Sequence, residues 1–395
     1  MLTHIRLQGF KSFVDQSVAM GRRVVCVGPN ASGKSNLFDA LCFLKGLASG
    51  LSIAETLEGH REGGHLTWPG VRGGFEVRRA DCSDLTITTG WTLDGQQLDH
   101  EITCRFSPEP HIVRECVSGQ RFAEVRAIEL PDQTSSGVAE VSIPHDAGGR
   151  SIERVADTTR SHLARPQAAW DIDPELAAVF QAMRAISPVD VRPDLMRGFV
   201  SLSARDLGSN AENLSAVLHL LARDPEKRAA IVDWLRSLCA PELEDLGFIE
   251  VQEVNQVMLK LVERGGTAIS ARSLSDGTLH FLGMLVAIYT APASSLLLLE
   301  DLDAGLHPSR LRSLVQAFER AGDPGAEQVM VTTHSPYVLA ALERESLRDS
   351  ILFNRSLLGN GSLIRRLGDL PDFDEVEERL GIVRMFETEW LEQAL

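Results

Sequence analysis

The sequence predicts an α/β fold in which short buried strands alternate with helices, extended by a β-rich part and a helical part. Two observations carry this prediction. Arg23 to Val27 is a β-branched run that ends at a glycine, and apolar residues with helical spacing follow it over Asn36 to Leu47. A run of leucines, Leu296 to Leu299, has the length and the flanks of a strand buried on both faces. The 395 residues suffice for one large domain or two linked lobes with a full core.

The elements around the first strand follow in order. Ile5 and Leu7 alternate with polar residues as in a strand, and Gly9 to Phe13 is expected to turn the chain. From about Gly63 to Leu130, short alternating runs punctuated by glycine predict an antiparallel β lobe. Residues 131 to about 165 are rich in Gly, Ser, Thr and Asp without a period, so we expect a loop or irregular insertion.

Helical patterning returns in the second half of the chain. It covers Asp173 to Ala185 and then Ala211 to Leu238, which is expected to form two helices split near Pro225. Strands are expected at Phe248 to Val254 and at Val257 to Val262. These elements predict a helical lobe before the chain returns to an α/β order.

The stretch from Phe281 to Leu299 is apolar and nearly long enough to span a bilayer. Pro292, followed by Ser294 and Ser295, divides it into a buried helix and a buried strand. We therefore expect no membrane span. The start of the chain lacks the features of a signal peptide, and the six cysteines lack disulfide or zinc spacing, which favours a cytoplasmic protein.

The formal net charge of −16 argues against a wholly basic nucleic-acid-binding surface. A local DNA-binding surface stays open, because arginines gather in the middle of the chain; a solvated face is the other interpretation of Arg150, Arg154, Arg160 and Arg165. Acidic residues cluster near the end, including the Asp372 to Asp374 triplet, which we interpret as a solvated acidic tail rather than a metal site.

The strongest motif, GPNASGKS, follows the first buried strand and opens a helix, which is the setting of a phosphate loop. Gly28 and Gly33 let backbone N–H groups turn toward a phosphate, and Lys34 can reach the β- and γ-phosphates. The Ser35 hydroxyl is a candidate Mg²⁺ ligand. These features predict an ATP and Mg²⁺ site whose nucleotide-binding residues are Gly28, Pro29, Asn30, Ala31, Ser32, Gly33, Lys34, Ser35 and Asn36.

The second motif is LLLLED, in which a buried strand delivers two carboxylates to the edge where ligands bind in open α/β sheets. By position, Glu300 is the metal-side acid and Asp301 is the candidate catalytic base that orients the attacking water. We also single out the segment Leu274 to Thr278 and the histidine of Thr332 to Ser335, each placed next to one of the expected buried elements.

The order of phosphate loop, LSDGT, LLLLED, DAGLHP and TTHS resembles the ATPase heads of the ABC superfamily. The resemblance is to the branch with RecF, structural-maintenance-of-chromosomes (SMC) heads and overcoming-lysogenization-defect (OLD) proteins. It implies a P-loop NTPase, an ABC-type head with an antiparallel β lobe and a helical lobe inserted between Walker A and the signature motif. It covers Leu2 to about Leu339.

Further residue roles follow from the resemblance. Ser275 and Gly277 match the signature loop, which binds the γ-phosphate of ATP held by the other subunit, so an ATP-sandwiched homodimer is implied. Asp303 to His307 match the D-loop at the dimer interface. His334 matches the switch histidine that contacts the γ-phosphate, and it joins Lys34, Glu300 and Asp301 as a catalytic residue.

The implied organisation has consecutive parts. They are residues 1–62, the N-terminal part of the ATPase domain with the phosphate loop; 63–130, the antiparallel β lobe; 131–172, an irregular insertion; 173–245, the helical lobe; 246–352, the C-terminal part of the ATPase domain; and 353–395, an acidic C-terminal tail.

The chain departs from the family pattern in several places. The carboxylates come as Glu then Asp, the reverse of the usual order, which implies slower hydrolysis because Asp301 is one methylene shorter. Leu302 stands where proline is common, and the signature reads SDG rather than SGG. No glutamine stands at the Q-loop position; Asp190, Arg192 and Asp194 lie there instead.

Three functions remain open on these grounds. The first is an ATP-hydrolysing dimer that regulates a separate effector, such as a nuclease or toxin, or that acts in DNA repair or antiviral defence. The second is an ATP-dependent dimerisation switch without hydrolysis. The third is a P-loop kinase, which leaves the LSDGT and TTHS motifs without a purpose.

Overall fold

The computed structural model describes residues 1–119, 125–129, 139–144, 150–155, 157–161, 163–164, 174–238, 243–320, 328–356 and 361–394. Its centre is a six-stranded sheet with the order β12-β17-β18-β3-β19-β20, in which every pair is parallel except β19 with β20. The strands are β3 (Arg23–Val27), β12 (Ile186–Val189), β17 (Leu296–Leu299), β18 (Gln328–Thr333), β19 (Ile351–Arg355) and β20 (Ser362–Arg366). Because parallel strands end at one edge, the segments that follow β3, β17 and β18 meet there.

An eight-stranded antiparallel sheet begins with the N-terminal hairpin and has the order β11-β10-β9-β8-β7-β6-β1-β2. Its strands are β1 (Leu2–Phe10), β2 (Phe13–Ala19), β6 (Asp84–Leu93), β7 (Gln96–Arg105), β8 (His111–Gly119), β9 (Val125–Glu129), β10 (Ala139–Pro144) and β11 (Arg150–Val155). The strands β4 (His60–Glu62) and β5 (His65–Trp68) form a separate hairpin. The predicted β lobe thus shares its sheet with the N-terminal strands.

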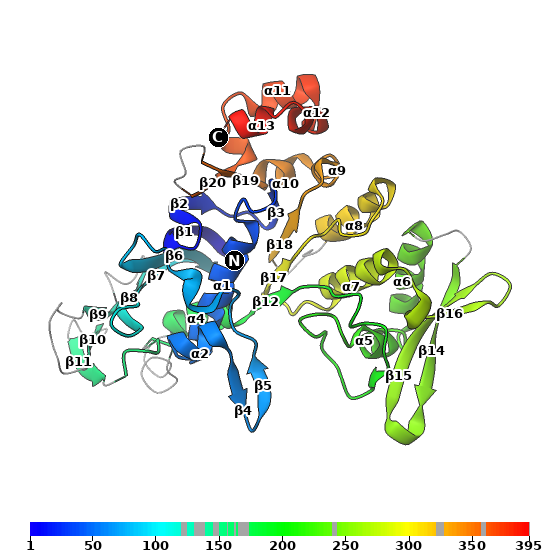
Figure 1. The fold of residues 1–395 in the computed structure, drawn as a ribbon, viewed down its shortest axis with the longest axis horizontal. Coiled ribbons are helices and arrows are strands. Elements are labelled where there is room, and N and C mark those ends of the chain that lie inside the picture. Colours follow the sequence, from blue (N-terminus) through cyan, green and yellow to red (C-terminus); the bar gives the residue numbers. More distant parts are fainter. Residues whose placement is uncertain are drawn as a thin grey trace.

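A third sheet packs with two helices. Figure 1 draws this part in green, on the side of the central sheet away from the eight-stranded sheet. It consists of β13 (Val200–Ser201), β14 (Leu243–Val251), β15 (Gln256–Glu263) and β16 (Ala268–Ser270). The helices α5 (Leu214–Leu221) and α6 (Pro225–Leu238) pack against β15 and β14 respectively.

The remaining helices surround the central sheet and the chain ends. They are α1 (Lys34–Ala48), α2 (Ile53–Glu58), α4 (Pro174–Arg184), α7 (Asp276–Thr290), α8 (Pro308–Arg320), α9 (Pro336–Leu339), α10 (Arg344–Asp349), α11 (Phe373–Leu380), α12 (Ile382–Glu387) and α13 (Trp390–Gln393). Helix α1 packs against α4, and α7 against α8 and α5. Figure 1 shows α11 to α13 together beyond β19 and β20.

The central sheet is buried on both faces, and successive residues of its strands enter two different cores. Leu297 and Leu299 of β17 pack into the core that contains α5 to α8. Leu296 and Leu298 pack into the core that contains α1, α4 and the eight-stranded sheet. This alternation explains why every residue of the strand is apolar.

Many expected elements are confirmed. The strand at 23–27 has the bounds expected, and the helix expected at 36–47 is α1, which begins at Lys34. The helical stretch at 211–238 divides into α5 and α6 at Pro225. The segment 281–299 contains the end of α7 and the separate strand β17. Among the described residues, none of the helices has both the length and the apolar character that crossing a bilayer requires.

Other expectations were wrong. Residues 131–172 were expected to be irregular, but the described part contains the paired strands β10 and β11. Residues 131–138, 145–149, 156, 162 and 165–172 lie outside the described residues. The strand expected at 248–254 is β14, which lies earlier, because residues 252–254 form a 3₁₀ turn. The end of the chain is not a solvated tail: Phe373 is buried, and Asp374 forms ion pairs with Arg348 and Arg344.

The proposed division into domains stays a prediction. So does the basic surface: the side chains of Arg150, Arg154 and Arg165 lie outside the described residues. Arg160 is described and forms ion pairs with Glu55 and Asp157, which fits a structural role for that one arginine.

Candidate nucleotide-binding site

The phosphate loop connects β3 to α1 at the carboxyl edge of the central sheet. Gly28 has φ 153°, and a Cβ atom there would lie 2.2 Å from the Phe353 carbonyl oxygen of β19. Gly33 has φ 109°, and a Cβ atom there would lie 2.5 Å from the Ser362 hydroxyl. Both glycines are therefore required by the backbone and by close packing, so the loop is built into the sheet edge.

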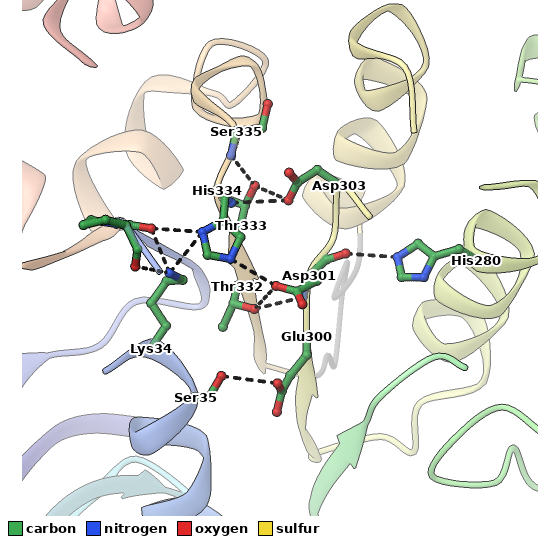
Figure 2. Close-up of polar contacts among 12 residues, drawn as sticks. Lys34, Ser35, His280, Glu300, Asp301, Asp303, Thr332, Thr333, His334 and Ser335 are labelled. Atoms are coloured by element: carbon green, nitrogen blue, oxygen red, sulfur yellow. Dashed lines mark hydrogen bonds and ion pairs between the residues drawn. The ribbon is translucent and has the colours of Figure 1, made fainter. Parts of the chain in front are cut away.

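The Lys34 side chain lies folded over this loop. Its ammonium donates hydrogen bonds to the carbonyl oxygens of Gly28 at 2.7 Å and Pro29 at 2.8 Å, and it lies 3.3 Å from His334 Nδ1 (Figure 2). Burial lowers the pKa of Lys34, while the charge of Asp301 opposes this effect. A cation held in this way can exchange its carbonyl partners for phosphate oxygens.

The two candidate metal ligands, Ser35 and Glu300, lie next to one another. The Ser35 hydroxyl donates to Glu300 Oε2 at 3.3 Å, which brings the first turn of α1 to the end of β17 (Figure 2). A hydroxyl and a carboxylate are the hard oxygen donors that Mg²⁺ prefers, so these residues fit the metal.

A cation that the sequence interpretation missed pairs with this carboxylate. Arg72 contacts Glu300 at 2.7 Å and Asp39 of α1 at 2.9 Å, and Lys11 contacts the other Asp39 oxygen at 2.6 Å. Burial alone would lower the pKa of Arg72, but the Glu300 and Asp39 carboxylates outweigh it and raise the pKa. A lone arginine in a glycine-rich loop has no sequence pattern that could have identified it.

Asp301 and His334 face one another across the ends of β17 and β18. Asp301 Oδ1 lies 3.5 Å from His334 Nε2, and the two side chains are about half exposed. Asp303 accepts a hydrogen bond from the Thr333 hydroxyl at 2.6 Å and one from the His334 backbone N–H at 3.4 Å. The loop after β17 is therefore fastened to the end of β18 (Figure 2).

A cavity of ≈ 430 Å³ lies beside the phosphate loop at this edge of the sheet. Its lining consists of Ser12, Asn30, Ala31, Ser32, Gly33, Lys34, Ser35, Asn36, Asp301, His334 and Arg355. Asn36 donates to the Ser12 hydroxyl at 2.8 Å, which fixes the β1–β2 turn to the site. The Ser32 hydroxyl, 1% exposed, has no hydrogen-bond partner among the described residues. Ser12 and Arg355 were not expected from the sequence.

The two signature residues lie apart from this cavity, at the start of α7. Ser275 is exposed and caps the helix: its hydroxyl accepts the Thr278 N–H at 3.1 Å. Gly277 lies against the loop after β17, since a Cβ atom there would be 2.4 Å from the Gly305 carbonyl oxygen. At the expected Q-loop position, Arg192 pairs with Asp194 at the surface, 3.4 Å away.

One comparison with known proteins identifies a family for this chain. The family described as "AAA domain, putative AbiEii toxin, Type IV TA system" matches residues 128–340, more than half of the chain. Among solved structures, the SMC head domain from Thermotoga maritima is similar at 14% identity and a TM-score of 0.44, over 92% of this chain and 98% of that one. No curated protein matches. Because this family model matches more than half of the chain, the chain belongs to this AAA-domain family.

Proposed function

We propose that the protein binds Mg²⁺-ATP, dimerises head to tail on it and hydrolyses it, and that the two states of the dimer regulate a partner. The observation that carries this proposal is the convergence of Lys34, Ser35, Glu300, Asp301 and His334 on one sheet edge. Three segments from separate parts of the chain, those that follow β3, β17 and β18, supply these groups. A phosphate loop alone would not require the other residues.

Each residue has a chemical task in this proposal. Backbone N–H groups of the loop and Lys34 bind the β- and γ-phosphates, and His334 contacts the γ-phosphate. Ser35 and Glu300 would hold Mg²⁺, which supplies charge neutralisation on the phosphate oxygens. Asp301 orients water and takes its proton as the water oxygen bonds to the γ-phosphorus. The bond to the bridging oxygen breaks, and ADP leaves with that electron pair.

The placement of Ser275 supports a dimer. Its hydroxyl and the α7 N-terminus are exposed and do not line the cavity of their own chain. A second copy, placed head to tail, could bring this helix N-terminus to the γ-phosphate, where the partial positive charge is favourable. The two ATP molecules would then lie between the protomers.

The partner is proposed to be a separate effector, a nuclease or toxin. The description of the matched family refers to a putative toxin and a Type IV TA system, which supports a role within a toxin–antitoxin pair. Antiviral defence is the wider role that we propose for such a pair. DNA repair, with DNA as a ligand, is the related proposal that the SMC-like motifs support. Co-purification with the products of neighbouring genes, with and without ATP, tests the choice of partner.

A switch without hydrolysis is the second candidate. Asp301 is one methylene shorter than the glutamate that is usual at this position, and its Oδ1 atom lies 3.5 Å from His334 Nε2. One experiment separates the two functions. Steady-state ATP turnover with Mg²⁺ is measured for the wild type and for Asp301→Asn, and the mass of each protein in solution is recorded with and without ATP.

Turnover that Asp301→Asn abolishes, together with an ATP-dependent dimer, supports the ATPase. A dimer on ATP without turnover supports the switch. A protein that neither binds ATP nor dimerises in its presence would refute both functions.

A further inference from the structure

The backbone of Asp301 has an unusual conformation that its surroundings hold from two sides. Its φ is 51°, in the left-handed region that non-glycine residues rarely adopt. The Asp301 N–H donates to the Thr332 hydroxyl at 2.8 Å, and the Asp301 carbonyl oxygen accepts from His280 Nε2 at 3.0 Å (Figure 2). Both backbone polar groups of the candidate catalytic base therefore contact a buried side chain, and the carbonyl oxygen also accepts the Ala304 N–H at 2.9 Å.

The two side chains that hold this backbone are themselves fixed. Thr332 is 1% exposed on β18, and His280 is 4% exposed on α7. A carbonyl oxygen can only accept, so the proton lies on His280 Nε2. Neither residue lines the cavity, so each acts on the site through Asp301.

His280 also connects two motifs. It lies on α7, the helix that Ser275 caps, little more than one turn from the signature residues. Gly277, at the start of the same helix, packs against Gly305 of the loop that follows β17. Two separate contacts thus join the signature end of α7 to the loop that carries Asp301.

We propose that His280 is a positioning residue for ATP hydrolysis: its hydrogen bond fixes the Asp301 backbone and makes the placement of the Asp301 carboxylate depend on helix α7. This inference rests on the proposed ATPase function. In a head-to-tail dimer of two copies, the same helix would touch the nucleotide bound by the partner subunit. Occupation of one site would then be transmitted to the catalytic base of the other.

A role of His280 in core packing alone and a role in positioning the base predict different effects of substitution. His280→Gln keeps an N–H donor near the place of Nε2, whereas His280→Leu fills similar space without a donor. Met284→Leu, a volume-conserving change at a fully buried position of the same helix, is the matched control for altered packing.

The test measures kcat, KM and the Hill coefficient for ATP in the wild type and in the three variants, with thermal unfolding recorded for each. We expect His280→Leu to lower kcat on the order of 10- to 100-fold with little change in KM, because a misplaced base slows chemistry without weakening phosphate binding. If the wild type has a Hill coefficient above one, we expect His280→Leu to lower it toward one. His280→Gln should recover most of kcat, and Met284→Leu should match the wild type.

If His280→Leu does not fold, Thr332→Val provides the second test. It removes the hydroxyl that accepts the Asp301 N–H and that lies 3.5 Å from Asp301 Oδ1, and it should give the same separation of kcat from KM. Wild-type turnover that neither variant changes, or a loss that Gln does not relieve, overturns the role of His280 and leaves the ATPase intact. A wild-type protein without turnover overturns the proposed hydrolysis, and the role of His280 with it.

Discussion

The Lys34 ammonium illustrates how a single residue prepares the site for phosphate. It is 5% exposed and is satisfied by two loop carbonyls, so binding exchanges these partners rather than desolvating a free cation. We expect Lys34→Ala to weaken ATP binding roughly 10- to 100-fold, because charge-assisted hydrogen bonds contribute about 1.5–3 kcal/mol each. Fluorescent-nucleotide titration measures this, with Lys227→Ala at an exposed position as the control. Equal affinities in the two variants would contradict the phosphate-loop role.

Arg72 makes a second prediction at this scale. Its guanidinium neutralises both Glu300 and Asp39, so it competes electrostatically with a divalent cation for the same carboxylates. Arg72→Gln should therefore lower the Mg²⁺ concentration for half-maximal ATP binding several-fold. Titration of Mg²⁺ at fixed ATP measures this, and Arg6→Gln, which removes an exposed pair with Asp15, is the control. An unchanged or higher Mg²⁺ requirement would show that Arg72 supports the site rather than competing in it.

These residues mark what local sequence can predict about the site. Lys34, Ser35 and Glu300 belong to motifs in which the residue type and the spacing follow from the chemistry of phosphate and metal. Arg72, Asp39 and His280 act through contacts made by distant segments, and nothing within a few residues of each distinguishes them from structural residues. Their roles depend on tertiary structure alone.

At the scale of elements, helix α7 combines a structural cap with a proposed contact to a second subunit. Ser275→Asp retains an N-cap and favours the helix dipole, but it places a negative charge where the γ-phosphate of the partner's ATP would lie. We expect this variant to keep its thermal stability and its monomeric ATP binding while losing ATP-dependent dimerisation.

Ser275→Asn separates charge from capping, because it caps the helix without adding charge. It should dimerise more readily than the aspartate variant. Light scattering with and without ATP measures both. Full dimerisation of Ser275→Asp would remove the signature helix from the interface.

A helix or strand could be predicted where its own residues specify it. Helix α1 and strand β17 were predicted because their apolar periods are strong and both elements are buried. Strands β10 and β11 were missed, because polar and glycine-rich segments flank them and their pairing, not their composition, defines them. The terminal helices were missed because acidic residues hid buried positions such as Phe373 and Ile382. Long-range packing decides such segments.

At the scale of the whole molecule, the central sheet is the common wall of two cores. One core extends into α5 to α8 and the third sheet, and the other into α1, α4 and the eight-stranded sheet. The nucleotide site lies at the edge of this shared sheet, so groups from either side of the sheet reach it. A nucleotide bound at this edge would therefore stabilise both halves together by mass action.

Strand β17 offers a direct test, because neighbouring leucines enter different cores. Leu297 and Leu298 are at most 1% exposed, and each truncation to alanine should cost about 2–5 kcal/mol through lost burial and a cavity. If the shared sheet couples the halves, calorimetry should show both variants lowering the same unfolding transition. Leu66→Ala, at a position 56% exposed, should leave it unchanged. Two transitions, each shifted by only one of the variants, would show instead that the halves unfold independently.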